Sequence, residues 1–164
     1  MASRGGSDLV HAETYYTFDD DGEITNAETL VIAGKTYTFQ DTLTNTDGNV
    51  HIGATREETI RNLCAAVNLD GTATAGTDYA AATTKNARVV AIPGDDEIVI
   101  RAHVPGTAGN LIPVTVGTSG VTVDNATLEN GAGDVGDFIN SVIELNQINS
   151  EVLSELKRLT PLPD

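Results

Sequence analysis

The sequence predicts a mainly β domain of the α+β class, either a small β-sandwich or a rolled sheet. Three features predict it: short apolar segments separated by turn residues, one helix-periodic segment at 55–69, and a heptad-spaced segment at 138–159. The 164 residues suit one domain with extensions. We divide the chain into an acidic N-terminal arm with an edge hairpin (1–27), a β-rich body (28–131), and a glycine hinge with a long C-terminal helix (132–164).

The first predicted element follows a flexible arm at residues 1–10. Residues 13–18, Glu-Thr-Tyr-Tyr-Thr-Phe, have the composition of a strand. Asp19 to Gly22 then form a turn signal, and residues 23–25 can start a second strand. We therefore expect a hairpin over residues 12–27 at the edge of the body.

The body contains the clearest strand signals. Tyr37 and Phe39 share one face of their segment by the period of two. Pro113 cannot donate to a ladder, so we expect it at an edge or a bulge. In chain order, the predicted strands are 28–33, 36–40, 49–53, 88–92, 97–102 and 111–116, with a last edge strand at 121–123.

The predicted first helix covers residues 55–69. Thr55 and Glu58 have the spacing of a capping box. Asp70 and Gly71 are expected to end the helix. Four residues form its buried face by spacing, Ile60, Leu63, Cys64 and Val67, and four are assigned to the solvent face, Arg56, Glu57, Arg61 and Asn62.

The C-terminal helix is predicted from a heptad seam. Pro161 and Pro163 would stop it, and it would be ~33 Å long. The seam residues are spaced alternately by four and three positions, and they are the predicted oligomer interface: Phe138, Val142, Leu145, Asn149, Val152, Leu156 and Leu159.

This seam has two interpretations. The helix could pack on its own body, or it could self-associate. Asn149 at a central core position is typical of a residue that fixes register. Val152 at a d position and Leu156 at an a position reverse the dimer preference. Ile139, Ile148 and Leu153 widen the apolar stripe, so a single facing helix does not cover it. We therefore expect a homo-oligomer, most simply a trimer.

Charge excludes several partners. With 24 acidic and 9 basic residues, the net charge is −15. Such a chain cannot replace phosphate counterions, so we expect no nucleic-acid partner. An anionic membrane surface is excluded for the same reason. No apolar run approaches the ~18 residues of a membrane span, and residues 1–7 lack the apolar core of a secretory signal.

No motif predicts catalysis, a metal or a cofactor. Asp19 to Glu23 lack the spaced ligands of a calcium loop. Gly106 to Asn110 lack the Lys-Ser/Thr pair of a phosphate loop. Cys64 has the spacing of a core residue and no basic neighbour. Three histidines, His11, His51 and His103, are scattered without ligand spacing.

Residues 30–131 resemble a β-rich module of tailed-bacteriophage virion proteins, which occurs in head, neck and tail accessory proteins and in large repeat adhesins. The resemblance implies a non-enzymatic structural role. It is carried by an ordered set of segments: Val31 to Phe39, His51 to Ala54, Asn62 to Asn68, Gly76 to Tyr79, and Pro105 to Asn110.

We therefore expect a virion structural protein that is assembled in the host cytoplasm. The first hypothesis is an accessory or decoration subunit on the capsid exterior. A second places the chain at the neck, tail or baseplate as an accessory or fibre adaptor. A third is a carbohydrate-binding adhesin module, which would need exposed aromatic platforms, and the chain has four Tyr, three Phe and no Trp.

Overall fold

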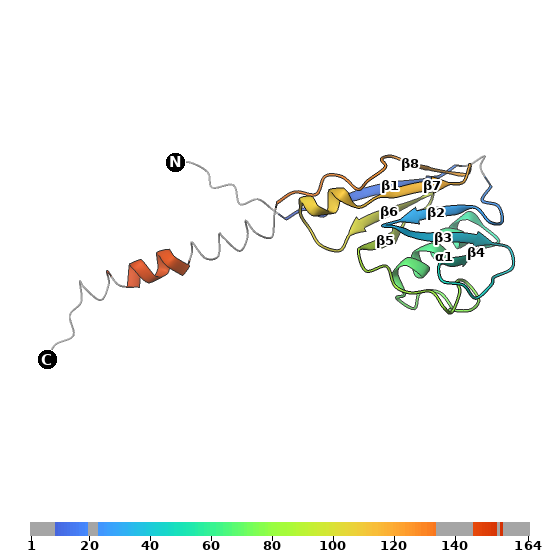
Figure 1. Ribbon diagram of the computed structural model, residues 1–164, viewed down its shortest axis with the longest axis horizontal. Helices are drawn as coiled ribbons and strands as arrows, with labels where there is room; N and C mark the ends of the chain where they lie inside the picture. Colours follow the sequence, from blue (N-terminus) through green and yellow to red (C-terminus); the bar gives the residue numbers. More distant parts are fainter. Residues whose placement is uncertain (1–8, 20–22, 134–145, 154, 156–164) are drawn as a thin grey trace.

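The computed structural model describes residues 9–19, 23–133, 146–153 and 155 (Figure 1). Within them the body is mainly β, as predicted. In chain order, its elements are β1 (Glu13–Phe18), β2 (Thr29–Ile32), β3 (Lys35–Gln40), β4 (Asn49–His51), α1 (Arg56–Asn68), β5 (Val89–Pro93), β6 (Glu97–Ala102), the 3-10 helix η1 (Thr107–Leu111), β7 (Val114–Gly117) and β8 (Val121–Val123).

The strands form two four-stranded sheets that enclose one core. One sheet has the order β5-β6-β1-β8 and the other β4-β3-β2-β7. All described strand pairs are antiparallel except β3 and β4, which are parallel. Alternate residues of each strand face inward, including the predicted pair Tyr37 and Phe39, which are fully buried.

The two open sides between the sheets are closed differently. On one side, edge strands β7 and β8 lie against each other. On the other side, α1 packs between edge strands β4 and β5. Because the helix is covered on both flanks, most of its residues are buried, including Ala65 and Ala66.

The helix begins as predicted and ends one residue earlier. Thr55 accepts a hydrogen bond from the Glu58 N–H at 3.1 Å. The Glu58 carboxylate accepts from the Ala54 N–H at 2.8 Å, one residue before the usual capping-box position. The left-handed residue at the C-terminus is Leu69, with φ 45°, so the prediction that Asp70 and Gly71 terminate the helix is wrong by one position.

Asn62 is also placed wrongly by the sequence prediction. It is buried, and its amide donates to the His51 carbonyl at 3.1 Å. This bond ties α1 to β4. A polar residue was assigned to the solvent face because spacing alone does not reveal a buried acceptor.

The predicted N-terminal hairpin over 12–27 is not formed. β1 is an interior strand that pairs with β6 and β8, and residues 23–25 are not a strand. The partners of β1 lie about eighty and a hundred positions further along the chain. β1 therefore lies inside its sheet and not at an edge.

Two further differences concern the C-terminal half. Residues 111–113 were predicted to begin a strand, but Leu111 ends η1 and the strand β7 starts at Val114. Pro113 lies just before this edge strand, as expected, and its carbonyl accepts from the Ala33 N–H at 2.9 Å. Residues 146–153 are helical, and the remainder of the predicted helix at 138–159, apart from residue 155, lies outside the described residues.

Candidate functional site

The predicted seam falls mainly outside the described residues. Asn149 and Val152 lie on the helical stretch 146–153 and are exposed, as are Ile148 and Leu153. The other seam residues lie outside the residues that the structure describes: Phe138, Val142, Leu145, Leu156 and Leu159. The seam therefore stays a prediction.

The described residues hold no cluster of three or more His, Cys, Asp or Glu side chains placed for a metal ion. His11 Nδ1 lies 2.7 Å from the Ala102 carbonyl oxygen, so the ring holds residue 11 against the end of β6. Asp96, at the tip of the β5–β6 hairpin, binds Arg56 at 2.5 Å. Cys64 is buried, and that burial, together with the charge of Asp70, raises its pKa to about 12.

The two ends of the described body meet at one end of the sandwich, which we call the stem end (residues 9–12, 102–112 and 128–133; Figure 1). The Val10 N–H donates to the Ala132 carbonyl at 2.9 Å, and the Ala132 N–H donates back at 3.2 Å. Glu13 and Glu129 exchange a second pair of backbone bonds, each of 2.8 Å. The chain therefore enters and leaves the body at the same place.

Small residues make this junction tight. A side chain at Gly131 would lie 2.4 Å from the Gly106 carbonyl oxygen, and one at Gly109 would lie 2.7 Å from the Ala12 Cβ. Asn110 locks the arrangement through both atoms of its amide, which bond the Gly131 N–H at 2.8 Å and the Gly131 carbonyl at 3.1 Å. The segment that leads to the seam thus leaves the body from a fixed position.

Exposed apolar side chains gather at the stem end. Among the described residues of the body, four large apolar side chains are exposed, and three of them are Val10, Val104 and Leu111. Leu111 is 76% exposed and Val104 is 60% exposed. A shallow groove of about 240 Å³ lies beside them and is lined by the side chains of Ala87, Arg88, Ala102, His103, Val104, Ala108 and Ile112, with Gly109.

The fourth exposed apolar side chain, Tyr15, lies on the outer face of β1. A groove of about 360 Å³ beside it is lined also by Val10, His11 and the ion pair of Glu13 with Arg101. The other aromatic residues of the described chain are buried: Tyr16, Phe18, Tyr37, Phe39 and Tyr79. Tyr15 is thus a single ring and not a platform of several.

A cleft of about 430 Å³ lies between the end of β1 and the start of α1. Arg56 stands in it, but the guanidinium already donates to the Phe18 carbonyl at 3.3 Å and binds Asp96. Thr59 also lines it, and its hydroxyl accepts from the Gly53 N–H and donates to the Thr55 carbonyl. The polar groups named here therefore stabilise the fold.

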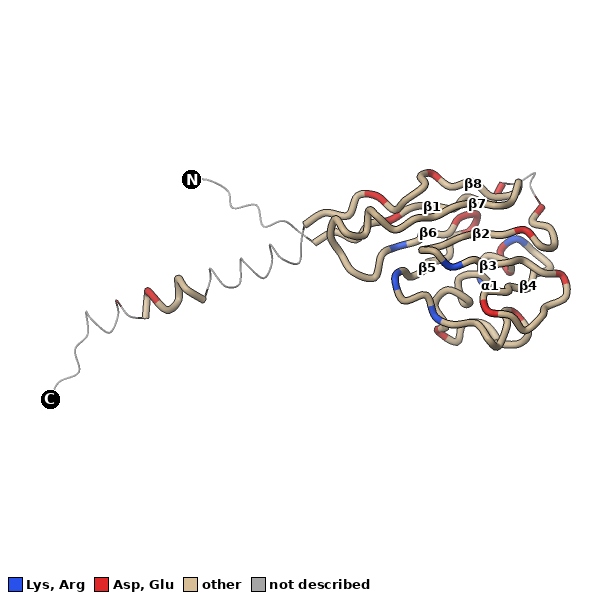
Figure 2. The backbone as a smooth tube through the Cα atoms, viewed as in Figure 1, with Lys and Arg blue, Asp and Glu red and all other residues tan. Residues whose placement is uncertain are grey.

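Charge is distributed unevenly over the body (Figure 2). Residues 102–133, which form η1, β7 and β8, contain acidic residues and no Lys or Arg. The basic residues of the body lie on the other elements, and three of them, Lys35, Arg56 and Arg101, form ion pairs. Arg88 forms no ion pair among the described residues.

Comparison of the chain with protein-family models, with curated proteins and with solved structures finds no match. Among the described residues, no helix is long and apolar enough to cross a membrane.

The sequence prediction missed the stem end. It assigned Leu111 to a strand because Leu111, Ile112, Val114 and Val116 give a strand-like apolar pattern. The signal that could have identified a break is Pro113, which cannot pair within a ladder, preceded by Asn110, a residue favoured in turns. The meeting of residues 10 and 132 has no local sequence signal.

Proposed function

We propose that this chain is a non-enzymatic structural subunit of a virion, most simply an accessory or decoration subunit on the outside of a phage capsid, assembled as a homotrimer through its C-terminal seam. The virion assignment rests on the resemblance of residues 30–131. The assembly mode rests on the heptad spacing of Phe138 to Leu159.

One structural observation supports the assembly mode. The chain leaves the body at Ala132, where it is bonded to Val10 and where Asn110 fixes Gly131. The seam follows within a few residues. A seam anchored in this way would bring the stem ends of the copies together and leave the opposite ends of the sandwiches free for other contacts.

Four buried side-chain amides support a structural role. Four buried asparagines hold backbone segments in place: Asn49 binds the Thr44 carbonyl at 3.1 Å, Asn62 binds β4, Asn68 binds β5, and Asn86 donates to the Ile32 carbonyl at 3.0 Å. Each amide has a partner that explains its burial in terms of the fold.

Light-scattering mass of the full chain tests the assembly mode. We expect the mass of three chains. Leu145→Asp places a charge in the middle of the seam. Burial of this charge would cost several kcal/mol of association free energy unless water can enter, so we expect the variant to be a folded monomer. Asn149→Leu, at the same seam, should keep or strengthen association while relaxing the choice of oligomer. A monomeric wild-type chain contradicts the proposal, and so does unfolding of Leu145→Asp without a folded monomer.

The neighbouring genes test the virion assignment. Capsid and scaffold genes on either side support decoration, and tail genes support the alternative of a neck, tail or baseplate accessory protein or fibre adaptor. A neighbourhood without any virion gene contradicts both.

A carbohydrate-binding adhesin is the weaker alternative. The observation that favours it is Tyr15, which is exposed beside the Glu13–Arg101 pair, because sugars stack on aromatic rings and bond to charged groups. Glycan-array binding that is lost in Tyr15→Ala supports this alternative. Equal signals from wild type and Tyr15→Ala contradict it.

A further inference from the structure

The stem end carries an exposed apolar side chain, Leu111, beside a shallow groove. Ala108 and Ile112 line the groove of about 240 Å³, together with Val104 and Ala102. Leu111 does not line it and is 76% exposed. One end of the body therefore offers both a protruding apolar side chain and a shallow apolar groove.

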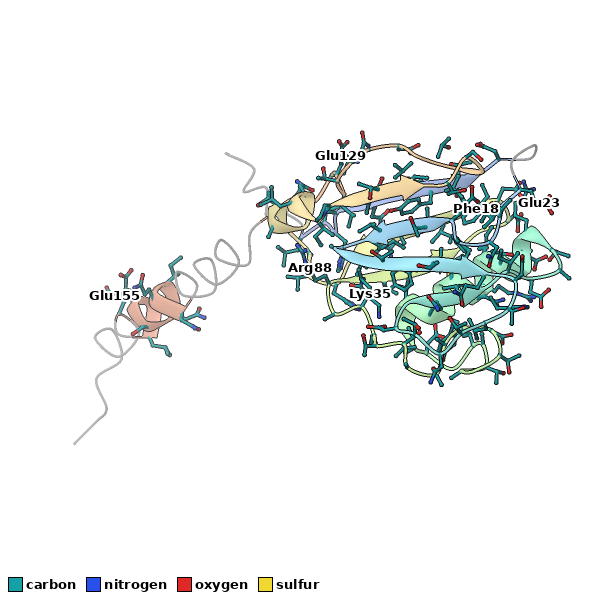
Figure 3. All side chains as sticks on the ribbon, turned by 45° about the vertical axis from the view of Figure 1, so that its right-hand side comes forward. Phe18, Glu23, Lys35, Arg88, Glu129 and Glu155 are labelled. Carbon is teal, nitrogen blue, oxygen red and sulfur yellow. The ribbon has the colours of Figure 1, made fainter. Side chains whose placement is uncertain are left out.

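Charges of opposite sign accompany these two features. Arg88 and His103 line the groove. The Leu128 N–H donates to the Ile112 carbonyl at 3.0 Å, so Glu129, the next residue, lies close to the end of η1. Figure 3 shows Glu129 and Arg88 on opposite sides of this end of the body. Both are exposed, and neither forms an ion pair among the described residues.

We propose that the stem ends of neighbouring copies contact each other head to tail, with Leu111 of one copy inserted into the groove lined by Val104, Ala108 and Ile112 of the next copy and Glu129 facing Arg88. The inference rests on the proposed function, because the occupant is a second copy held nearby by the seam.

The three-fold symmetry expected of the seam favours a ring over a two-fold contact. In a ring, each copy uses its knob on one neighbour and its groove on the other, which is a heterologous contact. Such a contact closes when three copies surround one axis, which is the symmetry expected of the seam. The seam supplies a high effective concentration, so a small contact suffices.

Cysteine cross-linking tests the contact. The double variant Leu111→Cys, Ala87→Cys places one thiol on the knob and one in the groove, on a separate segment of the chain, and a disulfide forms only when their Cα atoms approach within about 7 Å. After mild oxidation of the full chain, we expect a closed ring of three chains on a non-reducing gel. Cys64 does not compete because it is buried and its thiol stays protonated.

The single variants are the matched controls. In a heterologous contact, neither Leu111→Cys nor Ala87→Cys alone brings two identical thiols together, so neither should cross-link. Efficient dimers from either single variant would show a two-fold contact and overturn the proposal.

Light scattering of the same samples separates this proposal from the proposed function. A trimeric mass without cross-linking in the double variant overturns the stem-end contact and leaves the seam intact. A monomeric mass overturns both. Leu145→Asp in the double-variant background should abolish the cross-link, because the tether is lost. Cross-linking that persists in such a monomer at low concentration would arise from random collision and contradict the proposal.

Discussion

The side-chain amide of Asn68 pairs with both backbone polar groups of Ala91. Its Nδ2 donates to the Ala91 carbonyl at 2.7 Å, and its Oδ1 accepts from the Ala91 N–H at 2.9 Å. Asn68 is the last residue of α1, and Ala91 is the middle residue of edge strand β5. The amide thus takes the place of a neighbouring strand and blocks an edge that could otherwise pair with another chain.

Asn68→Ala should therefore lower the free energy of unfolding by about 2–4 kcal/mol, because two buried backbone groups lose their partners. Urea denaturation measures the loss. Arg61→Ala is the control, since Arg61 lies on the exposed face of the same helix. A loss of less than 1 kcal/mol in Asn68→Ala would mean that water replaces the amide at β5.

Local patterns account for most strands and for α1. The alternation in β2, β3, β5 and β6 is strong, and each of these strands pairs with a near neighbour through a short turn. The capping residues Thr55 and Glu58 mark the start of α1. In such segments, the pattern and the structure depend on the same residues, so a sequence predicts them well.

Long-range pairing accounts for what was not predicted. The two strands that pair with β1 lie far from it in the sequence, and Val10 lies far from its partner Ala132. Asn62 is assigned to the solvent face because helical spacing does not reveal its acceptor on β4, and the partner of Asn68 on β5 has no signal in the sequence of the helix either. The stem end, which carries the candidate interface, is joined to the N-terminal segment by such long-range contacts.

Stability should depend on the protonation of Asp47. Lys35 binds this carboxylate at 2.6 Å, and the Thr84 N–H and hydroxyl both donate to it at 3.0 Å. The ion pair with Lys35, followed by the Thr84 bonds, lowers the pKa of Asp47 below its ordinary value. The cluster joins the start of β3 to two loops.

The folded-state pKa is thus lower than the unfolded one, so the contribution is fully present above the unfolded value near 4 and is lost as the pH falls through the folded pKa. Asp47 is half exposed, so the contribution is about 0.2–1 kcal/mol. Asp47→Asn should cost this amount at pH 7, and the difference from wild type should shrink towards pH 3. Asp95→Asn, at the β5–β6 hairpin tip, is the control. An equal deficit at both pH values would contradict the assignment.

The β2–β3 turn can be improved. Ala33 and Gly34 connect Ile32 to Lys35 and both have positive φ, 55° and 83°, which is the backbone of a type I′ turn. Asn tolerates this conformation better than Ala does, so Ala33→Asn should raise the free energy of unfolding by about 0.5–1 kcal/mol. Thermal melting measures it, and Gly34→Ala should lower the melting temperature. A lower melting temperature for Ala33→Asn would show that the packing of Ala33 against the core outweighs the backbone gain.

Cys64 should react with thiol reagents only when the body opens. It is 3% exposed, and burial followed by the charge of Asp70 raises its pKa to about 12, so the reactive thiolate is scarce at neutral pH even before access is considered.

For a body of ordinary stability, labelling of the native protein at Cys64 should be slower than labelling in denaturant by a factor of about 10³ or more. Thr36→Cys supplies the control, because residue 36 is exposed on β3 and its thiol should label at once while Cys64 stays protected. Cys64→Ser should be the more destabilising of the two conservative changes, since the hydroxyl enters an apolar site among Ile60, Leu63 and Val67, whereas Cys64→Ala only removes a sulfur atom. Rapid labelling of native wild type would show that α1 opens independently of the two sheets, and the helix would then not be part of the cooperative core.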